Sequence, residues 1–145
     1  MPPSILVVDD HPGYMATVCQ MLALHLPSAQ ISTAADGSTA LRLVQQQPFD
    51  LLLLDYQLQT STGSDLVRQL RARAAGVGRP LPPIVMMSSQ PDVALFARTL
   101  GVAAFLPKPI LGEDISSTIV PLLQQTGANL SARRPLLWRL QRNAC

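Results

Sequence analysis

The sequence predicts an α/β protein in which helices cover both faces of a five-stranded parallel sheet. Short apolar runs alternate five times with segments whose apolar residues recur every three or four positions. This alternation is typical of successive strand–helix units, which assemble into a parallel sheet wrapped by helices. The 145 residues are enough for one domain with a substantial hydrophobic core and too few for two.

The first three strands are expected at residues 5–8, 31–34 and 51–54. The run LLLL at 51–54 carries no polar residue, as expected of a central strand covered on both faces. Between these strands, one helix is expected to begin near Pro12 and stop before Pro27, and a second follows the turn at Asp36-Gly37. The first helix would bury a stripe at helical spacing, formed by Met15, Val18, Cys19, Leu22 and Leu26.

The second half of the chain is expected to complete the sheet with two further strands. A helix follows Gly63, and the Gly- and Pro-rich stretch 76–83 is expected to be a loop. The remaining elements are expected at 84–88 (strand), 91–100 (helix), 103–106 (strand) and 113–125 (helix). Pro121 falls inside the last helix, where a proline costs about 3 kcal/mol, so we expect that helix to kink or to end there.

Polar side chains stand where the predicted strands end. Asp9 and Asp10 follow the first strand, Asp55 the third, Ser88 the fourth and Lys108 the fifth. In an open parallel sheet these carboxyl ends line one crevice, which is where ligands bind. Lys108 is the only lysine of the chain.

These fragments, taken together and in this order, resemble the receiver domains of bacterial two-component response regulators. The resemblance covers about residues 4–126 and is carried by four motifs, namely the strand ending in Asp9-Asp10, LLLLD with Asp55, VMMSS with Ser88, and FLPKP with Lys108 and Pro109. It implies a flavodoxin-like doubly wound sheet with strand order 2-1-3-4-5, an order that periodicity alone does not reveal.

The resemblance implies that Asp55 is the phosphoacceptor and that the cofactor is Mg2+. Asp10 and Asp55 would ligate the metal directly, Asp9 chiefly through water, and Gln57 through its backbone carbonyl. The chemistry of these groups agrees, because crowded carboxylates repel one another unless a cation or a raised pKa relieves them. Mg2+ prefers such oxygen ligands together with water and phosphate oxygens.

The resemblance also assigns the groups that would bind the phosphoryl oxygens and those that would change conformation on phosphorylation. Ser88 and Lys108 would bind the phosphoryl group, since a hydroxyl can donate one hydrogen bond and an ammonium is a compact charge. Ser88 and Phe105 occupy the positions of the family's switch pair, although plain core packing remains an alternative for Phe105. The Lys108–Pro109 bond is expected to be cis. His11 is expected to begin the first helix as a surface or cap residue rather than to act in catalysis.

Charge separates residues 1–126, which we expect to form the receiver domain, from a basic tail at 127–145. The first part contains nine acidic residues, six arginines and one lysine, whereas the tail contains four arginines and no acidic residue. The tail interleaves its arginines with leucines and one tryptophan, so a linker remnant and a short amphipathic helix both remain open. This basic footprint is small, which disfavours direct nucleic-acid binding.

Other sequence features argue against a membrane protein and against a zinc site. No apolar run reaches the roughly 18 residues that a membrane helix needs. The start of the chain shows no basic segment followed by a cleavable apolar one, so we expect a cytoplasmic protein. Cys19 lies on the first helix stripe and Cys145 ends the chain, with no spacing typical of zinc ligands or of a disulfide framework.

The predicted function is that of a phosphoacceptor receiver, a signalling module rather than an enzyme, which assists its own phosphorylation and dephosphorylation. A sensor histidine kinase or a histidine phosphotransfer protein would supply the phosphoryl group. The fourth helix, fifth strand and fifth helix would face an output domain, a partner protein or a second copy. The alternative is an interaction module that keeps the pocket without phosphorylation. A small-molecule enzyme is disfavoured, because the chain has no nucleotide-binding glycine motif and no second acid at Gln57.

Overall fold

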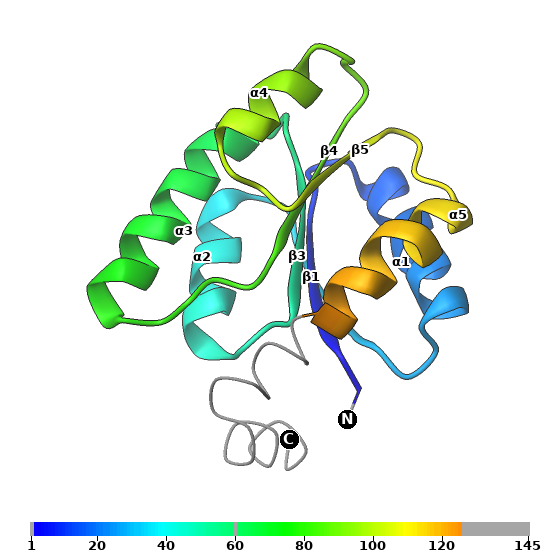
Figure 1. The fold of residues 1–145 in the computed structure, drawn as a ribbon, viewed down its shortest axis with the longest axis horizontal. Coiled ribbons are helices and arrows are strands. Elements are labelled where there is room, and N and C mark those ends of the chain that lie inside the picture. The colour runs from blue at the N-terminus through cyan, green and yellow to red at the C-terminus, as the bar shows by residue number, and fades with distance from the viewer. Residues whose placement is uncertain (1, 60, 126–145) are drawn as a thin grey trace.

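The computed structural model describes residues 2–59 and 61–125, which form a five-stranded parallel sheet between two layers of helices (Figure 1). The strand order is β2-β1-β3-β4-β5, which confirms the doubly wound order that the resemblance implied. The strands are β1 (Ser4–Val8), β2 (Gln30–Ala34), β3 (Leu51–Asp55), β4 (Ile84–Ser88) and β5 (Ala104–Pro107).

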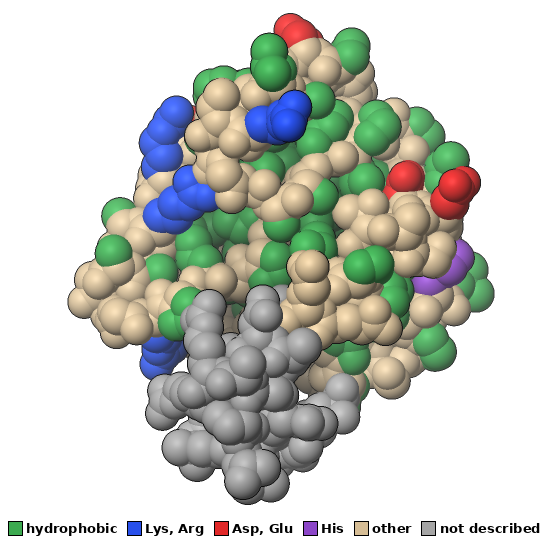
Figure 2. All heavy atoms as spheres, viewed as in Figure 1, with side chains coloured by type: hydrophobic (Ala, Val, Ile, Leu, Met, Phe, Trp, Pro, Cys, Tyr) green, Lys and Arg blue, Asp and Glu red, His purple; other side chains and the backbone are tan. Residues whose placement is uncertain are grey.

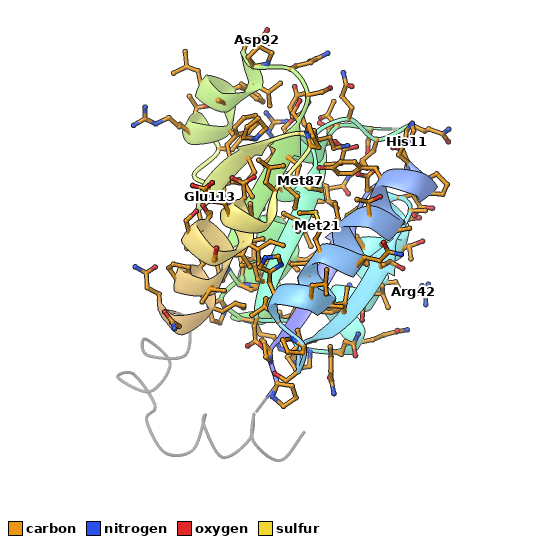
Figure 3. The ribbon with its side chains drawn as sticks, turned by 90° about the vertical axis from the view of Figure 1, so that its right-hand side faces the viewer. His11, Met21, Arg42, Met87, Asp92 and Glu113 are labelled. Carbon is orange, nitrogen blue, oxygen red and sulfur yellow. The ribbon has the colours of Figure 1, made fainter. Side chains whose placement is uncertain are left out.

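The helices divide between the two faces of the sheet. One face is covered by α1 (Pro12–His25) and by a final helical segment that lies beside it (Figure 3). This segment, called α5–η1 below, consists of α5 (Gly112–Asp114), the π-helix η1 (Ile115–Ile119) and helical residues 120–125. The other face is covered by α2 (Gly37–Gln46), α3 (Gly63–Val77) and α4 (Val93–Thr99).

Two apolar clusters, one on each face, hold these layers together. Because successive strand residues point to opposite faces, β3 sends Leu51 and Leu53 toward α1 and α5–η1, and Leu52 and Leu54 toward α2 and α3. All five residues of β3 are buried. The uninterrupted apolar run therefore reflects a central strand with helices on both sides, as predicted.

The predicted ends of α3 and α4 need correction. α3 begins with a capping box between Thr62 and Asp65 and continues to Val77, so the loop expected from residue 76 starts two residues later. Gly78 ends the helix in the left-handed conformation, with φ 69°, which glycine adopts without steric cost. Pro91 lies in a turn before α4 rather than at its first position.

Pro121 does not end the last helix, which continues to residue 125. The irregularity takes the form of the π-helix directly before the proline, where the Val120 N–H donates to the Ile115 carbonyl five residues back. A proline cannot donate an N–H, and π-turns are one way in which a helix accommodates such a break. Ile115 and Ile119 are fully buried in this segment, so packing against the sheet holds it in place.

Gly63 lies so close to the loop that follows β3 that a side chain at this position would clash with the backbone of the loop. A Cβ at this position would lie 2.7 Å from the Asp55 carbonyl oxygen and 3.0 Å from the Tyr56 Cα. Gly63→Ala is therefore expected to lower the free energy of unfolding by about 1–3 kcal/mol, measured by denaturant titration. The control is Gly76→Ala in the same helix, where a Cβ meets nothing within 4 Å and a gain of about 0.5–1 kcal/mol is expected. Equal losses in both variants would contradict this interpretation.

The surface is unevenly charged. In the space-filling view, basic side chains gather over α3 and α4, and acidic ones lie over the start of α5–η1 and at the top, beside the start of α4 (Figure 2). Exposed arginines are Arg68, Arg71 and Arg73 on α3, Arg79 just after it and Arg98 on α4. Among the helices of residues 2–59 and 61–125, none combines the length and the hydropathy that crossing a membrane would require.

Candidate functional site

The carboxyl ends of β1 and β3 bring three carboxylates together. The register pairs Val8 with Leu54, so Asp9 and Asp55 are the next neighbours along the two strands and point to the same face. With Asp10 they form the acidic cluster, in which one carboxylate oxygen from each residue lies within 4.8 Å of the others. Asp9 is fully buried, Asp55 is buried and Asp10 is half-buried.

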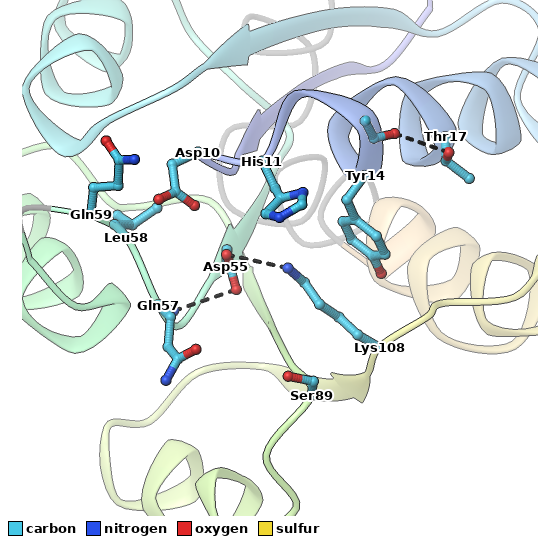
Figure 4. A pocket seen from close by; sticks show the side chains of 11 residues that line it. Asp10, His11, Tyr14, Thr17, Asp55, Gln57, Leu58, Gln59, Ser89 and Lys108 are labelled. Atoms are coloured by element: carbon cyan, nitrogen blue, oxygen red, sulfur yellow. Dashed lines mark hydrogen bonds and ion pairs between the residues drawn. The ribbon is translucent and has the colours of Figure 1, made fainter.

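Lys108 reaches this cluster from the loop after β5. Its Nζ lies 3.1 Å from Asp9 Oδ2. It also lies 3.2 Å from Asp55 Oδ2 (Figure 4). The Lys108 backbone N–H donates to the Ser88 carbonyl at 2.9 Å, which holds the start of the loop against β4. The Lys108–Pro109 bond is cis, the conformation that the resemblance implied. The ammonium thus contacts two carboxylates that lie 99 and 53 positions away in the sequence.

The charges of the site do not balance, and the pKa values reflect this. Burial, and then the nearby Asp9 carboxylate, raise the pKa of Asp55 from 3.8 to about 6, although Lys108 acts in the opposite direction. Burial disfavours the Lys108 ammonium, but its hydrogen bond to Asp9 and the charges of Asp55 and Asp9 outweigh this and raise its pKa. Three carboxylates share one cation, and all three offer the hard oxygen ligands that Mg2+ binds, so the residues present fit that metal.

The loop after β3 places Gln57 beside the phosphoacceptor candidate. The Gln57 N–H donates to Asp55 Oδ1 at 3.4 Å. Gln57 also forms an isolated antiparallel bridge with Thr62, whose two hydrogen bonds are made by the flanking residues and not by the Gln57 carbonyl. This arrangement leaves the carbonyl outside the bridge, as a metal ligand would have to be.

Ser88 and Phe105 share one face of two neighbouring strands. Ser88 is buried at the end of β4, and its Oγ accepts the N–H of Gln90 at 3.0 Å. Phe105 is half-buried on β5, in register with Met86, and packs on the cluster beneath α2, α3 and α4. Of the two serines at the end of β4, Ser89 lines the cavity beside Asp55, whereas Ser88 does not.

A cavity of about 710 Å³ opens over the acidic cluster and runs along the start of α1. Its walls include two α1 residues that the sequence analysis did not assign to the site, Tyr14 and Thr17. No helical spacing relates Tyr14 to Asp10, because Asp10 precedes the N-cap of α1. Only the nearness of Tyr14 to the Asp9-Asp10 pair in the sequence could have drawn attention to it. His11 is the exposed N-cap of α1, as predicted, and its backbone N–H donates to Asp9 Oδ1 at 2.8 Å.

Comparison with known proteins agrees with this geometry. The family described as "Response regulator receiver domain" matches residues 5–120. The transcriptional regulatory protein TcrX of Mycobacterium tuberculosis is 30% identical over 128 residues, which cover 87% of this chain and 52% of TcrX. The transcriptional regulatory protein GlrR of Escherichia coli is 29% identical, covering 99% of this chain and 33% of GlrR. The chain thus spans about half the length of TcrX and a third of the length of GlrR.

Solved structures show the same fold. The chemotaxis protein CheY4 of Vibrio cholerae superposes with a TM-score of 0.72 at 25% identity, over 84% of this chain and 99% of CheY4. Both the strand order and the acidic cluster at the ends of β1 and β3 agree with the family match. The chain therefore belongs to the response regulator receiver domain family.

Proposed function

We propose that the chain is a cytoplasmic phosphoacceptor that receives a phosphoryl group on Asp55 from the phosphohistidine of a sensor kinase or of a histidine phosphotransfer protein. One observation carries this proposal. A buried carboxylate at the end of the central strand lies 3.2 Å from the only lysine of the chain, beside two further carboxylates. Such a site has a nucleophile, a cation for phosphoryl oxygens and ligands for a metal.

The transfer itself needs little chemistry from the protein. A carboxylate oxygen of Asp55 attacks the phosphorus, and a new O–P bond forms as the P–N bond to the donor imidazole breaks. The imidazole nitrogen keeps the electron pair of the broken bond and takes up a proton. The protein contributes mainly by positioning the reactants and neutralising their charge.

The residues around Asp55 would divide this task. Asp10, Asp55 and the Gln57 carbonyl would bind Mg2+ directly. Asp9 would bind it chiefly through a water molecule. When bound, the metal would neutralise charge on the phosphoryl oxygens. Lys108 would move from the carboxylate oxygens to a phosphoryl oxygen. The Ser88 hydroxyl, whose oxygen accepts the Gln90 N–H in this structure, would donate a hydrogen bond to another phosphoryl oxygen.

The same movement would change a distant surface. As Ser88 turns toward the phosphoryl group, Phe105 would turn inward on the neighbouring strand. α4, β5 and α5–η1 form the output surface, on which Leu95 is 71% and Phe96 38% exposed. We propose that this surface binds an output domain, a partner protein or a second copy of the chain.

The proposed domain boundary at residue 126 and the role of the tail at 127–145 lie outside the described residues.

The proposal is tested by incubating the protein with acetyl phosphate and Mg2+, followed by intact mass spectrometry. We expect a mass increase of one phosphoryl group with Mg2+ and none when EDTA replaces the metal, because the crowded carboxylates would then repel the donor. Transfer from a phosphorylated histidine phosphotransfer protein tests the natural donor class. Absence of any adduct in the presence of Mg2+ would favour the alternative function, an interaction module that works without phosphorylation.

A further inference from the structure

Tyr14 makes two contacts with the loop that carries Lys108, one through its ring and one through its hydroxyl. The Lys108 Nζ lies over the Tyr14 ring, 4.2 Å from its centroid. The Tyr14 hydroxyl oxygen accepts the backbone N–H of Ile110 at 3.0 Å. A single side chain of α1 therefore holds both the ammonium of Lys108 and the main chain two residues further on.

We propose that Tyr14 is a positioning residue for Lys108, which its ring holds over the Asp55 carboxylate while its hydroxyl ties the loop to α1. This role rests on the proposed function of Asp55 as phosphoacceptor. It assigns a task in phosphoryl transfer to a residue that contributes no metal ligand and need not touch the phosphoryl group.

The geometry around the ammonium explains why a ring is suited to this task. Lys108 has three N–H donors on a flexible stem, and two of them are directed to carboxylate oxygens of Asp9 and Asp55 at 3.1 and 3.2 Å. The face of the Tyr14 ring attracts the ammonium on the side that is not directed to the carboxylates, and this attraction requires no hydrogen-bond acceptor. The ring can therefore keep its hold when Lys108 exchanges a carboxylate oxygen for a phosphoryl oxygen.

The hydroxyl contact fixes the other end of the same loop. Ile110 is buried, so its N–H would be left without a partner if the phenol were removed. Tyr14 is itself partly buried against the cluster that α1 and α5–η1 share, so the ring has little freedom to move away. The two contacts can be separated by substitution, because Tyr14→Phe keeps the ring and Tyr14→Leu removes both.

Because the chain has one lysine, the ring contact can be measured directly. In untagged protein labelled with 13C-lysine, a single lysine spin system is expected, and the Tyr14 ring should shift its terminal CH2 protons upfield from the values of free lysine. Tyr14→Leu is expected to abolish this shift and Tyr14→Phe to preserve it. A wild-type lysine signal at the free value would overturn the proposal, whatever the variants do.

The second measurement is the rate of phosphorylation by acetyl phosphate with saturating Mg2+. Tyr14→Leu is expected to slow it about three- to tenfold, the range that a partly buried cation–π contact provides, and Tyr14→Phe to recover most of the loss. The control is Gln20→Ala, also on α1, at an exposed residue that does not line the cavity, and it should change neither the rate nor the lysine signal.

The outcomes distinguish this inference from the proposed function. An unchanged rate in Tyr14→Leu, or an equal loss in Tyr14→Phe, would overturn the role of the ring. Failure of the wild type to form any adduct would instead overturn the function assigned to Asp55, while the lysine signal would still report on the contact.

Discussion

Asp55→Asn is expected to abolish covalent phosphorylation and, at the same time, to raise the free energy of unfolding at neutral pH by about 2–3 kcal/mol. Both effects have one cause. The carboxylate that makes Asp55 a nucleophile is buried beside Asp9, which raises its pKa from 3.8 to about 6. At neutral pH the folded protein must keep this group charged against burial and repulsion, and asparagine removes that charge.

The pH dependence follows from the direction of the shift. A carboxyl group whose pKa is higher in the folded state binds its proton more tightly there, so it favours folding when protonated. This contribution is present at low pH and is lost as the pH rises from about 4 through about 6. The stability of the wild type relative to Asp55→Asn should therefore fall across this window and level off above it.

Denaturant titrations of both proteins in EDTA, at several pH values, measure this difference, and other titrating groups cancel between the two. Intact mass after incubation with acetyl phosphate and Mg2+ measures the adduct. Two results would contradict the prediction: an adduct on Asp55→Asn equal to that on the wild type, or a variant that is less stable than the wild type at neutral pH.

The second large effect is expected from Lys108→Met, which keeps the length of the side chain and removes its charge. Phosphorylation of Asp55 should slow about 100-fold, as when one charge-stabilising donor is removed from an active site. The free energy of unfolding should fall by about 3 kcal/mol at neutral pH, because Asp9 and Asp55 would lose their shared ion-pair partner. Loss of this cation should also raise the pKa of Asp55 further.

The stability loss in Lys108→Met should shrink at low pH, where Asp55 is protonated and no longer needs the ammonium. Arg73→Met provides the matched control, since Arg73 is an exposed cation on α3, away from the acidic cluster. Substituting it should alter stability by less than about 0.5 kcal/mol and leave phosphorylation unchanged. Similar losses of stability and phosphorylation rate in both variants would show that Lys108 acts through the net charge of the protein rather than through its contacts with Asp9 and Asp55.

The alternation of strands and helices, and the chemistry of the main site residues, could be predicted from the order of the amino acids. An uninterrupted apolar run such as 51–54 can only be a strand or helix covered on all sides, and its length indicates a strand. Asp9, Asp10, Asp55 and Lys108 stand where such runs end, and parallel strands end at one edge of their sheet. The structure brings these four side chains together.

Features that depend on which elements lie side by side could not be read from the pattern of residues. Periodicity records which face of an element is buried but not which element lies beside it, so the strand order came only from the resemblance. For the same reason, the contacts of Tyr14 with Lys108 and Ile110, made across more than ninety positions, left no mark in the sequence. Pro121 shows the converse: its local cost predicted a break, but the buried Ile115 and Ile119 hold the helix together through a π-turn, because packing energy outweighs a missing hydrogen bond.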